Sequence, residues 1–307
     1  MLSQLATLIV LVAANPNANA DPSFNVDQFN KGPLYKTVPM TKSGTFTAGI
    51  EGPACDKSGT LFAVNFEKQQ TIGIVKPDGS ASLFVELPGI STGNGIRFNQ
   101  SGDMFVADYK GHNVLKITPA GKISVFAHNA SMNQPNDLAI APNGTLYASD
   151  PNWSKGTGQL WRINTDGTVV QEGKNMGTTN GVEVSPDGKT LYVNESVQRK
   201  IWAFDIKKNG GLKNKRLLKS FDDHGFDGMR CDSEGNLYVT RYGKGTVVII
   251  SPKGEIVREV DVRCKKVSNI CFGGPDGRTA YVTDVDNKRI VAFRVEVPGL
   301  SWKLWQR

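Results

Sequence analysis

The stretch NDLAIAPNGTLYASD (residues 136–150) is one of six similar phrases that decide the fold. Each phrase opens with a side chain that ends in oxygen, passes through a mixed apolar run to a turn with glycine, and ends in a strongly β-forming run. The openings lie 43, 42, 44, 47 and 42 residues apart, at Glu51, Asn94, Asn136, Asn180, Asp227 and Asn269. A repeat of this length indicates one supersecondary unit per repeat.

Each repeat predicts four short antiparallel strands. In the third repeat the runs 138–141 and 146–150 flank a turn at Gly144, and the runs 159–163 and 168–173 follow. Glycine fits such a tight turn because it accepts positive φ without steric cost. No window shows helical spacing of apolar residues. We therefore predict an all-β fold, a six-bladed β-propeller with four antiparallel strands per blade, in one domain over residues 34–307.

The segment before the first phrase is expected to close the ring. Residues 42–50 (KSGTFTAGI) resemble the fourth strands that precede the other openings, and the sixth repeat lacks an obvious fourth strand. We expect the N-terminal segment to complete the sixth blade, which would remove exposed sheet edges. The tail 301–307 is expected to pack nearby or to add an edge strand.

Residues 1–20 have the features of a signal peptide. The apolar stretch from Leu5 to Ala14 is too short to span a bilayer. Ala18-Asn19-Ala20 fits the small-x-small rule for cleavage before Asp21, although no Lys or Arg precedes the apolar stretch. An uncleaved anchor and a disordered lead are the alternatives. We expect a secreted or periplasmic protein without a stable membrane span, in which residues 21–33 form a loose polar lead.

Charge and cysteine content exclude few functions. The chain has 36 Lys and Arg against 29 Asp and Glu, a net charge of +7, but the basic residues are scattered and no nucleic-acid motif is present. We expect no nucleic-acid partner, and nothing in the sequence sets the oligomeric state.

The chain has four cysteines, Cys55, Cys231, Cys264 and Cys271. They permit a disulfide in an exported protein, but the sequence does not assign a pairing.

The six opening residues are expected to form a ring, because rotation about the channel relates equivalent positions of different blades. The ring contains two carboxylates, Glu51 and Asp227, and four amides. Converging carboxylates repel each other and are costly to desolvate. Ca²⁺ takes oxygen ligands from carboxylates, amides and water, whereas structural zinc sites use Cys and His, which the ring lacks. The alternative is that these residues only cap turns, although no Ser, Gly or Thr replaces any of them.

One polar residue ends the β-forming run of each repeat, and we call this set the strand-ending column: Asn65, Asp108, Asp150, Glu195, Arg241 and Asp284. We expect it to be structural, because strand ends before turns are usually polar.

The loops should decide which substrate is bound. In the loop 151–158 we expect Trp153 to pack on its own loop, with a lid over the channel as the alternative.

Four phrases resemble the gluconolactonase, regucalcin and luciferin-regenerating-enzyme family, also known as the senescence marker protein type: residues 135–151, 179–193, 227–239 and 268–284. The resemblance extends over residues 45–295. It implies a six-bladed propeller with a divalent metal in the channel, most often Ca²⁺ with Zn²⁺, Mn²⁺ or Mg²⁺ as alternatives. It also implies hydrolysis of lactones, and related propellers hydrolyse organophosphates.

Carried over position by position, the resemblance implies metal ligands at Glu51, Asn136, Asn180 and Asp227, with Asp227 also catalytic. Asn136, Asn94 and Asn269 are expected to contact substrate, the last two with less settled roles. Gln134 stands where the regucalcin branch has an Arg, nothing matches that branch's substrate-binding Glu, and the paired histidines of the paraoxonase branch are missing. The chain is thus closer to the bacterial-type gluconolactonases, and specificity for sugar lactones is not implied.

The expected function is metal-dependent hydrolysis of a small-molecule lactone or ester. The cation would polarise the carbonyl, and Asp227 would act as general base or nucleophile. The alternatives are a non-catalytic calcium-containing ligand-binding propeller, an organophosphate hydrolase and a strictosidine-synthase-like enzyme.

Overall fold

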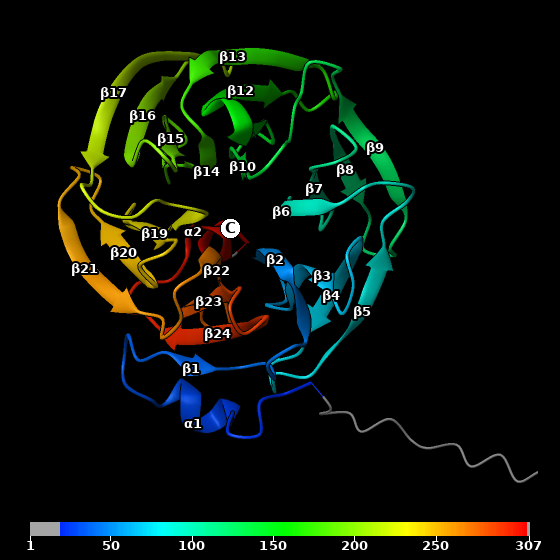
Figure 1. Ribbon diagram of the computed structural model, residues 1–307, viewed down its shortest axis with the longest axis vertical. Helices are drawn as coiled ribbons and strands as arrows, with labels where there is room; N and C mark the ends of the chain where they lie inside the picture. Colours follow the sequence, from blue (N-terminus) through cyan, green and yellow to red (C-terminus); the bar gives the residue numbers. More distant parts are fainter. Residues whose placement is uncertain (1–18, 306–307) are drawn as a thin grey trace, which may run out of the picture.

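The computed structural model describes residues 19–305, which form six four-stranded antiparallel sheets around a central channel (Figure 1). Blades one to three contain, from the channel outward, β2 (Phe46–Cys55), β3 (Leu61–Phe66), β4 (Thr71–Val75) and β5 (Ala81–Glu86); β6 (Gly93–Phe98), β7 (Met104–Asp108), β8 (Asn113–Ile117) and β9 (Ile123–His128); β10 (Leu138–Ile140), β11 (Leu146–Asn152), β12 (Thr157–Ile163) and β13 (Val169–Met176). A 3₁₀ turn, η1 (Trp153–Lys155), joins β11 to β12.

Blades four to six contain β14 (Thr179–Val184), β15 (Thr190–Glu195), β16 (Lys200–Ile206) and β17 (Leu212–Ser220); β18 (Met229–Cys231), β19 (Leu237–Arg241), β20 (Thr246–Ile250) and β21 (Ile256–Asp261); β22 (Val267–Gly273), β23 (Thr279–Asp284), β24 (Arg289–Arg294) and β1 (Val38–Pro39). The predicted six-bladed propeller is therefore confirmed. The predicted turn glycines all have positive φ: Gly59, Gly102, Gly144, Gly188, Gly235 and Gly277.

The N-terminal segment completes the sixth blade as predicted, but through a different stretch. β1 pairs antiparallel with β24, and Val38 lies opposite Ala292. Residues 46–50, expected to be part of that closing strand, instead begin β2, the inner strand of blade one. The backbone N–H groups of Met40 and Thr41 both donate to the Ile290 carbonyl, so the edge of β24 is covered before the chain turns inward.

The two ends of the described chain carry short helices. Residues 21–33, expected to be a loose lead, contain α1 (Val26–Asn30), which lies outside the ring beside β1 (Figure 1). Asn25 caps α1 by accepting from the Gln28 N–H. Phe24 and Phe29 pack together and against the core, with ring centroids 5.4 Å apart. The predicted signal segment lies outside the described residues apart from Asn19 and Ala20.

The C-terminal tail differs from the prediction, because it forms α2 (Leu300–Trp305) rather than an edge strand. Leu300 and Leu304 line a cavity at the end of the channel together with residues from all six inner strands. Gly299 makes this approach possible, since a Cβ there would overlap the side chain of Phe272. Within residues 19–305, neither helix has the length or the apolar character that crossing a bilayer requires.

The core lies between neighbouring blades. One cluster joins Phe62 and Val64 of blade one to Met104 and Val106 of blade two, and equivalent clusters fill the other junctions. Burial of each such side chain contributes about 1.5–3 kcal/mol. The four cysteines are free, and the sulfur atoms of Cys55 and Cys271, on the inner strands of blades one and six, lie 4.0 Å apart. This packing fixes the inner strands against one another around the channel.

Candidate functional site

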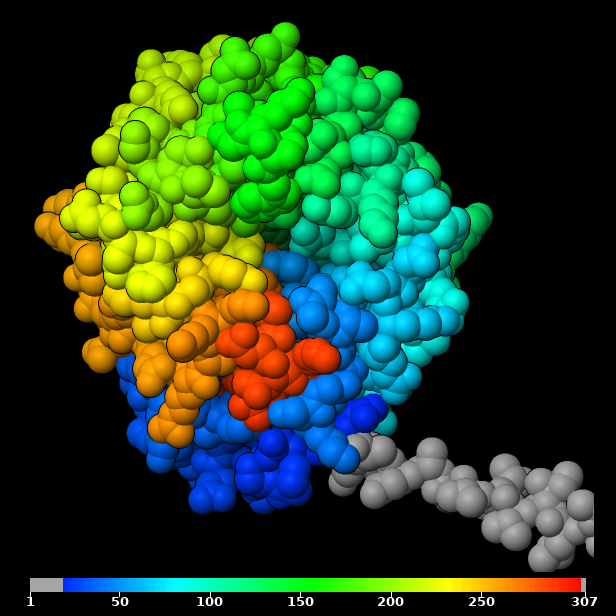
Figure 2. Space-filling view, in the orientation of Figure 1, coloured from blue at the N-terminus to red at the C-terminus, as the bar shows by residue number. Residues whose placement is uncertain are grey.

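The predicted ring of oxygen-bearing side chains lies at one mouth of the channel. Five of its six members line a single cavity of about 290 Å³, which we call the chamber: Glu51, Asn94, Asn136, Asn180 and Asp227. Figure 2 shows a hollow near the middle of this face of the molecule, where segments from different blades meet. The chamber is therefore built from residues that lie on, or just before, the inner strands of five blades.

Irregular strand pairing aims these side chains at the channel. The pairing of the inner strand with its neighbour shifts register around Glu51, Asn94, Asn180 and Asn269. Such bulges re-aim a side chain that regular pleating would point elsewhere. The glycine that follows several ring residues allows adjacent strands to come close, because a Cβ on Gly52 would overlap the Asn94 carbonyl oxygen.

The two carboxylates of the ring disfavour each other's charge. Glu51 Oε2 accepts hydrogen bonds from the Gly52 N–H at 2.6 Å and from Asn269 Nδ2 at 2.8 Å. Burial nevertheless raises the pKa of Glu51 to about 7. Burial and the charge of Glu51 together raise the pKa of Asp227 well above its usual range, and a hydrogen bond from Asn180 only partly offsets this. Both groups would be stabilised as anions by a cation in the chamber.

Asn180 carries an unpaired buried oxygen. Its Nδ2 donates to Ser196 Oγ at 3.0 Å, and that hydroxyl donates to the Phe226 carbonyl at 2.6 Å. These hydrogen bonds hold the nitrogen of the Asn180 amide against Ser196. Asn180 Oδ1 is buried and has no hydrogen-bond partner among residues 19–305. A buried acceptor without a partner is costly, and a cation bonded to this oxygen would remove that cost.

Asn269 does not face the chamber. Its side chain is 1% exposed, with Nδ2 donating to Glu51 and Oδ1 accepting from the Ile270 N–H at 2.9 Å. The substrate contact expected from the sequence therefore has no opening to reach, and Asn269 instead orients Glu51. Asn94 and Asn136 do line the chamber, as expected.

Polar side chains within the second strands hold the ring in place, and sequence reasoning missed them. Asn194 Nδ2 donates to the Asp227 carbonyl at 2.6 Å, and Thr240 Oγ1 donates to the Gly228 carbonyl at 2.9 Å. Ser149 Oγ accepts from the Asp137 N–H, and Thr283 Oγ1 accepts from the Asn269 N–H. In four of the six blades, the residue one position before the strand-ending column is polar, and this was the available signal.

The strand-ending column is structural, as expected. Asp108 accepts from the backbone of Thr92 and Gly111, and Asp150 accepts from the backbone of Asn133 and Gln134. These buried carboxylates fix the loops that lead into the ring. Arg241 replaces the carboxylate in blade five and instead donates to Asp223 at 2.6 Å.

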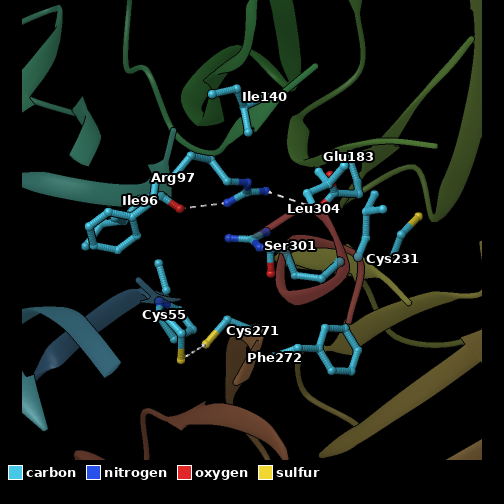
Figure 3. Close-up of a pocket in the computed structure, with 15 residues that line it drawn as sticks. Cys55, Ile96, Arg97, Ile140, Glu183, Cys231, Cys271, Phe272, Ser301 and Leu304 are labelled. Carbon is cyan, nitrogen blue, oxygen red and sulfur yellow. Dashed lines mark hydrogen bonds and ion pairs between the residues drawn. The ribbon is translucent and has the colours of Figure 1, made fainter. Parts of the chain in front are cut away.

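A buried charged layer closes the channel beneath the ring. Asp137 lies between two guanidinium groups, 3.4 Å from Arg97 and 3.0 Å from Arg230, and Glu183 lies 3.6 Å from Arg97. A cavity of about 60 Å³ lies between the inner strands and α2, and Arg97 and Glu183 line it together with Ser301 and Leu304 (Figure 3). Buried charges require partners, and here two acids match two bases. The chamber is consequently blind at its inner end.

A second cavity, of about 560 Å³, opens beside the chamber; we call it the side pocket. It shares Asn180, Asp227, Trp153 and Tyr242 with the chamber. Trp153 therefore lines the mouth of the channel, whereas the sequence favoured packing on its own loop.

One further group of potential ligands lies away from the ring, with ligand atoms of Cys264, Asp284 and Asp286 within 4.8 Å of one another. Three of the four carboxylate oxygens already accept hydrogen bonds. Asp284 accepts from Asn287 and Arg289, and Asp286 accepts from two backbone N–H groups. Burial and the charge of Asp284 raise the pKa of the Cys264 thiol, which disfavours a thiolate ligand.

The residues of the ring fit a hard divalent cation. Glu51 and Asp227 supply two carboxylates of raised pKa, and Asn180 supplies an unpaired amide oxygen. Asn136 is within the same chamber. The absence of sulfur and imidazole from this set favours calcium or magnesium over zinc.

Comparisons with known proteins agree with this architecture. A gluconolactonase of Zymomonas mobilis is 26% identical over 327 aligned positions, which cover 94% of this chain and 90% of the relative. The diisopropyl-fluorophosphatase of Loligo vulgaris is 26% identical over 85% of this chain and 93% of its own length. A solved calcium-binding regucalcin from Agrobacterium tumefaciens superposes with a TM-score of 0.73 at 21% identity, covering 87% of this chain and 95% of that one.

The family model that describes the SMP-30/gluconolactonase/LRE-like region matches residues 50–286. That range begins one residue before Glu51 and contains all six ring positions. The chain therefore belongs to the SMP-30/gluconolactonase/LRE-like family.

Proposed function

We propose that this protein is a divalent-metal-dependent hydrolase of lactones or related esters, with Ca²⁺ as the metal. The observation that carries the proposal is that Asn180, whose buried Oδ1 has no hydrogen-bond partner among residues 19–305, lines one cavity with two carboxylates of raised pKa. Family membership and the full-length similarity to a gluconolactonase support the reaction class.

Glu51, Asn136, Asn180 and Asp227 would hold the cation. When bound, the cation supplies Lewis-acid polarisation of the substrate carbonyl. Asn269 keeps Glu51 oriented, and Ser196 holds the nitrogen of the Asn180 amide and so fixes the orientation of that side chain. Such supporting hydrogen bonds set the geometry of metal ligands.

Asp227 is the proposed catalytic residue. It would take a proton from the water that attacks the carbonyl carbon and return it to the alkoxide that leaves when the ester C–O bond breaks. Direct attack by the carboxylate is the alternative route. Asn94 and Asn136, whose side chains line the chamber, would orient the substrate. Because the charged layer closes the channel below, substrate and water enter from one side.

A hydrolysis panel tests the proposal. Purified protein is stripped with EDTA and assayed on D-glucono-δ-lactone, δ-valerolactone, δ-dodecalactone, phenyl acetate and a phosphotriester, with and without added Ca²⁺. We expect hydrolysis of at least one lactone or ester that depends on Ca²⁺. Activity unaffected by chelation would remove the metal from the mechanism, and inertness with tight Ca²⁺ binding would favour a ligand-binding propeller.

The phosphotriester arm has its own support. The diisopropyl-fluorophosphatase relative is similar over 93% of its length, and attack on phosphorus requires the same polarising cation and a carboxylate. Hydrolysis of the phosphotriester alone would assign the protein to that reaction class instead.

A further inference from the structure

The wall of the side pocket is mainly apolar. Trp153, Val197, Phe226 and Tyr242 contribute to it, and it opens onto the chamber at Asn180 and Asp227. Val197 is 62% exposed, Trp153 40% and Tyr242 37%, so three large apolar side chains that stay in contact with solvent gather around one cavity. Exposed apolar residues around a concavity indicate a binding site.

Three polar side chains of the side pocket are held by hydrogen bonds within the protein. Ser196 Oγ accepts from Asn180 and donates to the Phe226 carbonyl. Arg199 Nη1 donates to the Asp222 carbonyl at 2.7 Å, and His224 Nδ1 pairs with Asp223 at 3.2 Å. A sugar hydroxyl placed against the side chain of Val197 or Phe226 would have no hydrogen-bond partner on that wall, and a hydroxyl buried without a partner loses binding free energy. An aryl or alkyl group would instead gain from burial there.

We propose that the substrate is a lactone or ester whose aryl or alkyl substituent lies in the side pocket while its scissile carbonyl lies at Asn180 and Asp227. The position of the carbonyl rests on the proposed hydrolase function. Polyhydroxylated sugar lactones are then poor substrates.

A ratio of rates tests this specificity. With Ca²⁺ present, we expect kcat/KM for δ-dodecalactone to exceed that for D-glucono-δ-lactone by at least about tenfold. Val197→Asp should reduce the preference for δ-dodecalactone over δ-valerolactone by at least about tenfold. The matched control is Val257→Asp on β21, whose side chain is 59% exposed and outside both cavities; it should leave that ratio unchanged. A preference for the sugar lactone, or an equal effect of the two variants, would overturn the inference.

Binding of lactams separates this inference from the proposed function. The lactam analogue of δ-dodecalactone and δ-valerolactam resist hydrolysis, so calorimetric titration of both does not depend on turnover. We expect the alkyl lactam to bind at least about tenfold more tightly to the wild-type protein, and Val197→Asp to abolish the difference. If every lactone and ester is inert, the hydrolase function fails, and this titration alone decides the side pocket. Equal affinities for the two lactams would refute the substrate class whatever the activity.

Discussion

Replacement of Glu51 by Gln should stabilise the metal-free protein at alkaline pH. Burial raises the pKa of Glu51 from 4.5 to about 7 in the folded state. A carboxyl with a raised folded-state pKa stabilises the protein below its unfolded pKa, and this contribution is lost as the pH rises through the folded value. The wild-type protein without metal should therefore lose stability between about pH 4.5 and pH 7, and Glu51→Gln should remove that loss.

The size of the effect follows from the shift. Since one pKa unit corresponds to about 1.4 kcal/mol, the shift of Glu51 corresponds to at most about 3 kcal/mol, and less because Glu51 faces the open chamber. For a chain of this length that is at most about 5 °C in Tm. Gln retains an oxygen that can accept from the Gly52 N–H and from Asn269 Nδ2, the two donors that Glu51 uses.

Thermal unfolding followed by circular dichroism measures this prediction. EDTA-treated wild type, Glu51→Gln and the exposed control Glu255→Gln are compared at about pH 5 and about pH 8.5. We expect Glu51→Gln to raise Tm by a few degrees at the higher pH only, and Ca²⁺ to raise the Tm of wild type but not of this variant. A Glu51→Gln protein that is no more stable than wild type at about pH 8.5 would refute the claim that the buried charge of Glu51 destabilises the metal-free protein.

Three further predictions concern the site and the chain terminus. Asp227→Asn should lower kcat for lactone hydrolysis by about 10²-fold or more at saturating Ca²⁺ while the near-ultraviolet circular dichroism stays native; retained turnover would remove Asp227 from the catalytic role. Ser196→Ala should weaken Ca²⁺ binding by about tenfold in a calorimetric titration, since the acceptor that orients Asn180 is lost; unchanged affinity would show that this hydrogen bond is dispensable. Protein secreted from an expression host should begin at Asp21 by intact mass, and an intact residue 20 in the exported product would contradict the proposed signal cleavage.

The sequence was sufficient for the architecture because six copies of one phrase gave six independent indications of the same unit. The closing strand was harder to place. β1 contains only Val38 and Pro39, and it joins β24 through backbone hydrogen bonds that leave no side-chain pattern. The helix α2 was missed for a similar reason, since a six-residue segment is too short to display helical periodicity.

The ring was predictable as a set of positions, but the direction of each side chain was not. Asn269 is followed by Ile270 where Glu51, Asn94, Asn180 and Asp227 are followed by glycine, and its oxygen bonds to the Ile270 N–H. The charged layer beneath the ring was overlooked although each member is a lone charge in an apolar inner run. Its pairing joins residues far apart in sequence, such as Asp137 and Arg230.

The side pocket could not be derived from the repeat. Its wall comes from loops between strands, where Trp153, Val197 and Tyr242 follow the strand-ending column without a common pattern. Loops of this kind vary in length and composition between blades, so their side chains meet only in the folded ring.

The stoichiometry of calcium binding tests the central claim most directly. Calorimetric titration of Ca²⁺ into EDTA-treated wild type is compared with Asn180→Leu, which is similar in size and lacks the unpaired buried oxygen. We predict one tight Ca²⁺ site per chain in the wild type. In the variant this site should be lost or greatly weakened, and Ca²⁺-dependent hydrolysis should be lost with it. Undiminished calcium binding by Asn180→Leu would contradict the assignment of the ring as the metal site.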